Sequence, residues 1–171
     1  THFFSKSNFN TDINIFESSK IDVIVQQVSQ DTYLKTHKLK SPLIDSETVL
    51  NSKIEFEGIN KNLDLSIYTE VYEDLSKSNS DRYQYILPYF NFSKNLFDNN
   101  SFGSFNFLSQ GDNILKDTNS LRSRMINNLN IQSFDFISKN GFKNNFGFHF
   151  IIFPLKLQYS TYYYEIRVSQ F

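Results

Sequence analysis

Three histidines are the residues of this chain whose type best suits metal binding, but their spacing does not favour it. His2, His37 and His149 lie far apart in the sequence, and none belongs to a His-x-x-x-His pair. A metal site needs several ligands that converge on one point. The chain has no cysteine, which excludes thiol chemistry and disulfides. We therefore expect no metal and no cofactor, and we interpret the histidines as solvated or lumen-facing.

Paired carboxylates are the second set of residues with catalytic potential, because glycosidases use two of them. Such pairs occur at Glu55/Glu57 and at Glu73/Asp74. Glu55 and Glu57 alternate with apolar residues, which indicates the hydrated face of a strand. The five glycines are scattered singly, so there is no phosphate-binding loop and no Gly-x-Ser-x-Gly elbow. We expect no enzyme and name no catalytic or cofactor-binding residue; the substrate-binding residues stay unknown.

Two further motifs are weak. Asn91-Phe92-Ser93 and Asn99-Asn100-Ser101 match the glycosylation sequon. With 20 Asn and 22 Ser in the chain, such matches arise by chance.

The stretch from Ser80 to Pro88, SDRYQYILP, is more specific: a charged turn that runs into a tyrosine-rich strand. We expect Arg82 to pair with Asp81 or with an acidic residue of a neighbouring strand. Proline lacks a backbone donor, so strand pairing should weaken at Pro88.

The elements that hold these residues show a period of two, the signature of strands with one polar and one apolar face. The clearest segments are Lys53–Gly58, Leu63–Val71, Arg82–Tyr89, Ser123–Ile131 and Asn145–Phe150. Less regular ones are 13–15, 21–25, Tyr33–Leu39 (which includes Lys35 and His37) and the pair Phe105/Phe107. No amphipathic helix is convincing; Ser120–Leu129 is the best candidate, and we favour a strand there.

Clusters of turn-forming residues separate these segments. They are 41–42, 58–62, 76–81, 97–101, 110–113 and Asn140-Gly141. Asn-Gly is a strong hairpin signal, because both positions tolerate positive φ. The alternation of strands and turns predicts an all-β fold, an antiparallel meander of about eight to ten strands.

Composition agrees with this fold and limits the function. The 171 residues suit one domain or a piece of a larger one, and alanine, the best helix former, is absent. The net charge of −1 does not indicate a nucleic-acid partner. No signal peptide is visible, so we expect either a processed chain or an internal fragment. No apolar run is long enough for a membrane helix.

Such a meander suits a soluble barrel, a sandwich or a piece of a membrane barrel. Strands of about ten residues with an aromatic-rich face favour a lipid-facing wall, and mixed polar residues on the other face suit a water-filled lumen. We expect an open fragment of a large transmembrane β-barrel.

Several segments resemble the outer-membrane lipopolysaccharide-assembly family LptD (also called OstA), in its alphaproteobacterial type. They are ESSKIDV at 17–23, DTYLK at 31–35, SPL at 41–43, VYEDL at 71–75, SDRYQYILP at 80–88, NLN at 128–130 and FISKNGF at 136–142. The resemblance covers roughly residues 10–147 and is highest around Asp81–Pro88.

The resemblance implies a segment of the C-terminal barrel that delivers lipopolysaccharide to the outer leaflet of a Gram-negative outer membrane, without catalysis, through a lumen and a lateral gate. Its implied partners are lipopolysaccharide, the plug lipoprotein LptE, the periplasmic bridge protein LptA and outer-membrane lipid. The disulfide cysteines of the family have no counterpart here. Lys35, Lys53 and Arg124 are the kind of residue that meets phosphates if they face inward.

Two alternatives stay open. One is another outer-membrane barrel, a porin or a TonB-dependent receptor; the other is a soluble β-sandwich that binds carbohydrate. The whole chain, 1–171, is interpreted as a single segment, in which 148–171 is an atypical tail. That tail, with tyrosines at 162–164, suits a divergent strand pair, a truncation-related frameshift or an aromatic girdle.

Overall fold

In the computed structural model the chain forms an antiparallel sheet, described for residues 1–38, 46–78, 80–99, 103–116, 120–152 and 164–169. Nine strands follow one another in the order β1-β2-β3-β4-β5-β6-β7-β10-β11 within these residues. Their bounds are His2–Thr11, Ser18–Val28, Val49–Asn60, Leu63–Asp74, Tyr83–Asn99, Gly103–Lys116, Ser120–Gln132, Gly147–Ile152 and Tyr164–Ser169. A separate hairpin joins β8 (Phe136–Ile137) to β9 (Lys143–Asn144). The predicted all-β antiparallel meander is confirmed.

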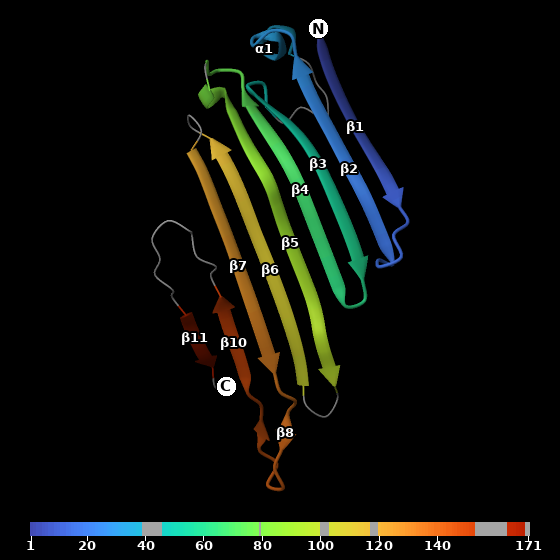
Figure 1. The fold of residues 1–171 in the computed structure, drawn as a ribbon, viewed down its shortest axis with the longest axis vertical. Coiled ribbons are helices and arrows are strands. Elements are labelled where there is room, and N and C mark those ends of the chain that lie inside the picture. The colour runs from blue at the N-terminus through green and yellow to red at the C-terminus, as the bar shows by residue number, and fades with distance from the viewer. Residues whose placement is uncertain (39–45, 79, 100–102, 117–119, 153–163, 170–171) are drawn as a thin grey trace.

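The sheet is a single open layer in the part of the chain that the structure describes (Figure 1). Each strand pairs with its sequence neighbour, except that β7 pairs with β10 across the β8–β9 hairpin. The edges are β1 and β11, which do not pair with each other. The short helix α1 (Tyr33–His37) lies at one end of the strands, and the β8–β9 hairpin lies at the other (Figure 1).

The two faces of the sheet differ in chemistry, because residues opposite each other in the register share a face. One row runs Phe9–Ile21–Phe56–Ile67–Phe90 across β1 to β5. The next residue along each strand points to the other face, as Asp22, Glu57 and Ser66 do. We call these the apolar face and the polar face. The predicted alternation therefore extends from β1 to β5.

A small apolar core lies at the end of the strands beside α1. Leu34 of α1, Leu50 of β3 and Leu75 after β4 are its buried members, with Phe4, Val28 and Tyr33 packed around them. We call Leu34, Leu50, Leu75, Asp31 and Arg82 the α1 corner. The predicted strand Tyr33–Leu39 is wrong over its described residues, since 33–37 are helical. The burial of Leu34 beside two leucines distant in sequence overrides the local alternation.

The predicted turn at 110–113 is also wrong, because these residues lie inside β6. Gly111 stands opposite Phe90, whose ring would come within 2.6 Å of a Cβ at that position. Asp112 is only 5% exposed. In mid-strand, Gly111 therefore allows the Phe90 ring to pack closely, and Asp112 forms an ion pair. Neither residue forms a turn. The residues Phe105 and Phe107, predicted as a separate strand, belong to the same β6.

Pro88 interrupts the ladders as predicted. The pairing of β5 with β6 shifts between Ile86 and Tyr89, and the pairing of β4 with β5 shifts between Tyr68 and Glu70. The missing donor of Pro88 accounts for this bulge.

Asn140-Gly141 lies in the β8–β9 turn, where Gly141 has a φ of 82°. Five residues separate the two strands, instead of the two-residue loop that Asn-Gly favours. The predicted strand Ser123–Ile131 is part of β7.

In the tail, β10 pairs with β7 on one side and with β11 on the other. Residues 153–163 and 170–171 lie outside the described part, as does the predicted turn at 41–42. Among the described residues, no helix has the length and apolar character needed to cross a membrane.

Candidate functional site

The polar face carries a line of functional side chains that the register places side by side. Across β1 to β7 the opposed residues are Asn8, Asp22, Glu55, Tyr68, Tyr89, Asp112 and Arg124. We call this line the central row. Cross-strand neighbours in an antiparallel sheet lie close enough for their side chains to interact. Seven residues that are far apart in sequence thus form one continuous polar surface.

The β1–β3 part of the central row is acidic and closely paired. Asn8 donates a hydrogen bond to Asp22. Lys20 Nζ lies 3.2 Å from Asp22 and 2.9 Å from Glu57, so one ammonium serves two carboxylates. Lys53 Nζ lies 2.8 Å from Glu55. Glu55 and Glu57 point to the polar face as predicted; Glu55 pairs with Lys53, and Glu57 shares Lys20 with Asp22. This arrangement is that of a paired, hydrated face.

The middle of the row is aromatic. The rings of Tyr68 and Tyr89 stack with centroids 4.7 Å apart. Lys53 Nζ lies 4.2 Å from the centroid of Tyr68. Because β4 lies between β3 and β5, Lys53 and Tyr89 approach Tyr68 from opposite sides. Tyr89 is therefore the outer ring of the stack, toward Asp112.

The β6–β7 part of the row is basic. Arg124 holds Asp112 Oδ1 through Nε at 2.9 Å and through Nη2 at 2.7 Å. The Nη2 atom of Arg122 lies 3.8 Å from the other carboxylate oxygen, beyond hydrogen-bonding distance. That oxygen, Asp112 Oδ2, is buried without a hydrogen-bond partner. The carboxylate is thus buried while both guanidinium groups remain exposed.

Charge is therefore divided across the polar face. On β2 to β4 it carries six acids and two lysines: Asp22, Glu55, Glu57, Asp64, Glu70, Asp74, Lys20 and Lys53. On β6 and β7 it carries one acid and three bases: Asp112, Lys116, Arg122 and Arg124. The surplus of positive charge lies on the β6–β7 side.

Arg82 joins the strand ends to the loop before α1. Its Nη atoms donate to both oxygens of Asp31 at 3.0 and 2.7 Å, and its Nε donates to Glu73 at 2.8 Å. These hydrogen bonds raise the pKa of Arg82 and lower the pKa of Asp31. The expected pairing with a neighbouring strand is confirmed by Glu73. The link to Asp31 was not predicted, because it spans 51 residues.

Glu73 and Asp74 do not act together, because Glu73 binds Arg82 and Asp74 binds Ser76 and Lys77. Asn91 lies within β5, and the second sequon extends beyond the described residues.

Two of the three histidines come close in space. The rings of His2 and His37 lie on Tyr33, with centroid distances of 5.3 and 4.4 Å. His149 lies on β10, opposite Asn130. In the described ranges, no group of three or more His, Cys, Asp or Glu could hold a metal ion.

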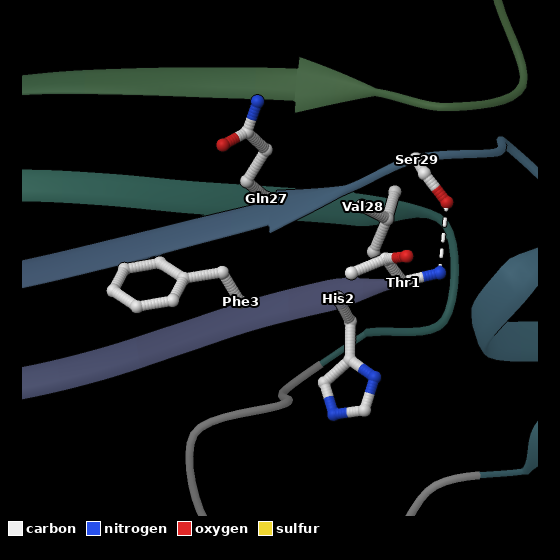
Figure 2. A pocket seen from close by; sticks show the side chains of 6 residues that line it. All are labelled: Thr1, His2, Phe3, Gln27, Val28 and Ser29. Carbon is white, nitrogen blue, oxygen red and sulfur yellow. Dashed lines mark hydrogen bonds between the residues drawn. The ribbon is translucent and has the colours of Figure 1, made fainter.

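A cavity of about 230 Å³ lies between the ends of β1 and β2 (Figure 2). Thr1, His2, Phe3, Gln27, Val28 and Ser29 line it. The amino group of Thr1 donates to Ser29 Oγ at 2.9 Å, and the side chains of His2 and Phe3 point apart (Figure 2). This lining brings together no cluster of charged groups. The polar face is therefore the stronger candidate site.

No family model, curated protein or solved structure matches the chain. The functional argument therefore rests on the geometry and on the sequence resemblance. Of the three cations considered for phosphate contact, Lys53 and Arg124 lie on the polar face, whereas Lys35 lies on α1. Tyr68, Tyr89 and Asp112 were not predicted as site residues. Their signal is the register, which a single sequence does not reveal.

Proposed function

We propose that this chain forms part of the wall of an outer-membrane β-barrel of the LptD type, which carries lipopolysaccharide without catalysis. One observation carries the proposal: a single-layer sheet has one broad apolar face that is largely exposed and one polar face that carries charged, amide and tyrosine side chains. A membrane barrel requires both faces, because lipid covers the outside and water fills the lumen.

Most of the apolar face has no protein cover in the described residues. The exceptions are Leu50, which belongs to the small core with Leu34 of α1, and Phe56, on which Phe16 packs with ring centroids 5.7 Å apart. Large side chains on it stay exposed, among them Phe9 at 55%, Ile54 at 56% and Leu121 at 58%. In a β-sandwich, side chains of a second sheet would bury such residues. The other described elements, α1 and the β8–β9 hairpin, lie at opposite ends of the strands (Figure 1). The apolar face therefore favours lipid as its partner over the soluble sandwich.

Strand length agrees with this proposal. A membrane-spanning strand needs about 9–11 residues at a tilt of about 45°. The strands from β1 to β7 have 10, 11, 12, 12, 17, 14 and 13 residues. Each is long enough to cross.

Lipopolysaccharide as cargo, the partners LptE and LptA, and the outer-membrane location rest on the sequence resemblance. The polar face adds support, because its charged, amide and tyrosine side chains suit a phosphorylated saccharide. A porin or a TonB-dependent receptor shares the two-faced wall and is the second candidate.

Paired cysteine substitutions in the natural gene product test the membrane wall, since this chain has no cysteine of its own. Ile67→Cys and Ser66→Cys are neighbours on β4 that point to opposite faces. We expect a fluorophore at 67 to be quenched by brominated lipid and a thiol at 66 to react with a water-soluble maleimide. Equal quenching at the two positions would contradict a membrane wall.

Photocrosslinking tests the cargo. We replace Asn91, on the polar face, or its neighbour Phe92, on the apolar face, by p-benzoylphenylalanine. The LptD hypothesis predicts that the crosslinker at position 91 captures lipopolysaccharide only while cells synthesise it. The crosslinker at position 92 should capture bulk lipid at all times. If 91 captures no lipopolysaccharide although 66 and 67 behave as expected, the chain belongs to another kind of barrel.

A further inference from the structure

We infer that Arg122 and Arg124 on β7 form a binding site for the phosphate group of a phosphorylated saccharide, and that Asp112 positions them. The inference rests on the proposed function in one respect: the polar face must line the aqueous path. Arg124 was among the cations considered for phosphate contact from the sequence; the structure adds Arg122, Asp112 and Tyr89 and the geometry that joins them.

The geometry of Asp112 shows how the pair is held. Its side chain is 6% exposed, whereas those of Arg122 and Arg124 are 62% and 63% exposed. One carboxylate oxygen accepts a hydrogen bond from Arg124 Nε and lies 2.7 Å from Arg124 Nη2, and the other lies 3.8 Å from Arg122 Nη2. A guanidinium carries five N–H donors in a planar fork. Most N–H donors of Arg122 and Arg124 therefore face solvent. The buried carboxylate of Asp112 holds the edge of the Arg124 guanidinium group that faces the sheet.

The balance of charge separates this pair from Lys20 and Lys53, which lie on the same polar face. Lys20 lies between two carboxylates, and Lys53 lies 2.8 Å from Glu55. At β6–β7 the ratio is reversed, since two guanidinium groups share one carboxylate. An anion is attracted where positive charge is in excess, and guanidinium groups bind phosphate through parallel hydrogen bonds. The arginine pair is therefore the anion site that we assign to the polar face.

The neighbouring ring makes the ligand a sugar phosphate rather than a free phosphate ion. Tyr89 stands directly opposite Asp112, which in turn stands opposite Arg124. Its ring is the outer member of the stack with Tyr68, half-buried at the surface of the polar face. A phosphate held by the arginines thus places the ring to which it is attached beside an aromatic side chain.

The test measures binding to the full chain, folded in detergent micelles. The probes are the phosphorylated core oligosaccharide released from lipopolysaccharide, the same oligosaccharide after phosphatase treatment, and inorganic phosphate. We expect the phosphorylated oligosaccharide to bind most tightly, and binding to weaken as salt rises. Arg124→Gln should lower its affinity about tenfold, as loss of a charge-assisted hydrogen-bond pair predicts. Arg122→Gln should act in the same direction.

Lys20→Gln is the matched control, because it removes one positive charge from the same polar face at a point where carboxylates are in excess. We expect it to leave the affinity unchanged. Equal losses in K20Q and R124Q would overturn the site in favour of general electrostatics. Equal affinity for the phosphorylated and phosphatase-treated oligosaccharides would also overturn it.

Asp112→Asn separates positioning from charge. Removing a carboxylate makes the face more positive, so charge alone would raise the affinity. If Asp112 positions the guanidinium groups, the affinity falls instead, and a rise would contradict that role. The cysteine pair at 66 and 67 keeps the two proposals apart. If 67 is in lipid while R124Q binds normally, only the phosphate site fails; if 67 is not in lipid, the proposed function fails.

Discussion

The α1 corner and the apolar face use hydrophobic residues in opposite ways. At the α1 corner, Leu34 and Leu50 are 1% and 2% exposed. On the apolar face, Phe9 and Ile54 are more than half exposed, although they are residues of similar apolar character. The described residues thus bury Leu34 and Leu50 against other side chains but leave Phe9 and Ile54 largely uncovered. Burial of apolar area stabilises a fold only where something covers it. The comparison supports the proposal that lipid covers the exposed part of the apolar face.

The largest expected effect comes from a substitution in the buried core of the α1 corner. Leu34→Ala removes a fully buried side chain and should lower the free energy of undocking α1 by about 2–5 kcal/mol. The amides of Thr36 and Lys38, which bond within α1, report undocking through hydrogen exchange. Ile54→Ala, at an exposed position, is the control and should leave this exchange unchanged. Slow exchange in L34A would show that α1 does not depend on this core.

The next effect tests the apolar face against the polar face of one strand. In vesicles, Ile67→Arg should lower the free energy of unfolding by about 2–4 kcal/mol, because it places a charge in hydrocarbon. Ser66→Arg, one residue away on the polar face, should change it by less than about 0.5 kcal/mol. Guanidinium titration in lipid vesicles measures both. Equal costs would mean that the two faces meet the same environment.

A smaller effect tests packing within the apolar face itself. Gly111→Ala brings a Cβ to within 2.6 Å of the Phe90 ring and 2.9 Å of the Arg124 carbonyl oxygen. Overpacking of this kind should cost about 1–3 kcal/mol in the same titration. Gly147→Ala is the control, because its nearest atom is 3.7 Å away. If G111A were as stable as G147A, the Phe90 ring and the neighbouring backbone would have to shift at little cost in free energy.

The smallest effect concerns the ionic part of the α1 corner. Hydrogen bonds from Arg82 lower the pKa of Asp31, so this pair stabilises the corner at neutral pH. The contribution is lost as the pH falls through the lowered pKa, which lies below the ordinary value of about 3.9. Titration of the Asp31 carboxyl carbon by NMR measures the midpoint. Arg82→Gln should return that midpoint toward the ordinary value; an unchanged midpoint would rule out the contact in solution.

The local alternation of polar and apolar residues was sufficient to predict most strands. It was insufficient where residues distant in the sequence pack together. The alternation in Leu63–Val71 predicted β4, and the missing donor of Pro88 predicted the bulge. Tyr33–Leu39 was wrong because Leu34 packs against Leu50 and Leu75, which no local window contains. The turn at 110–113 was wrong because Gly111 accommodates Phe90 from the neighbouring strand.

The sequence by itself determined that this protein is a meander with one apolar and one polar face, because side-chain direction in a strand repeats every two residues. Only the tertiary structure decided which side chains stand together. The register of β4 to β7 aligned Tyr68, Tyr89, Asp112 and Arg124. The bulges that shift this register depend on how neighbouring strands pair, and the alternation within one strand does not reveal that pairing. A shift by one residue would move every one of these side chains to the opposite face.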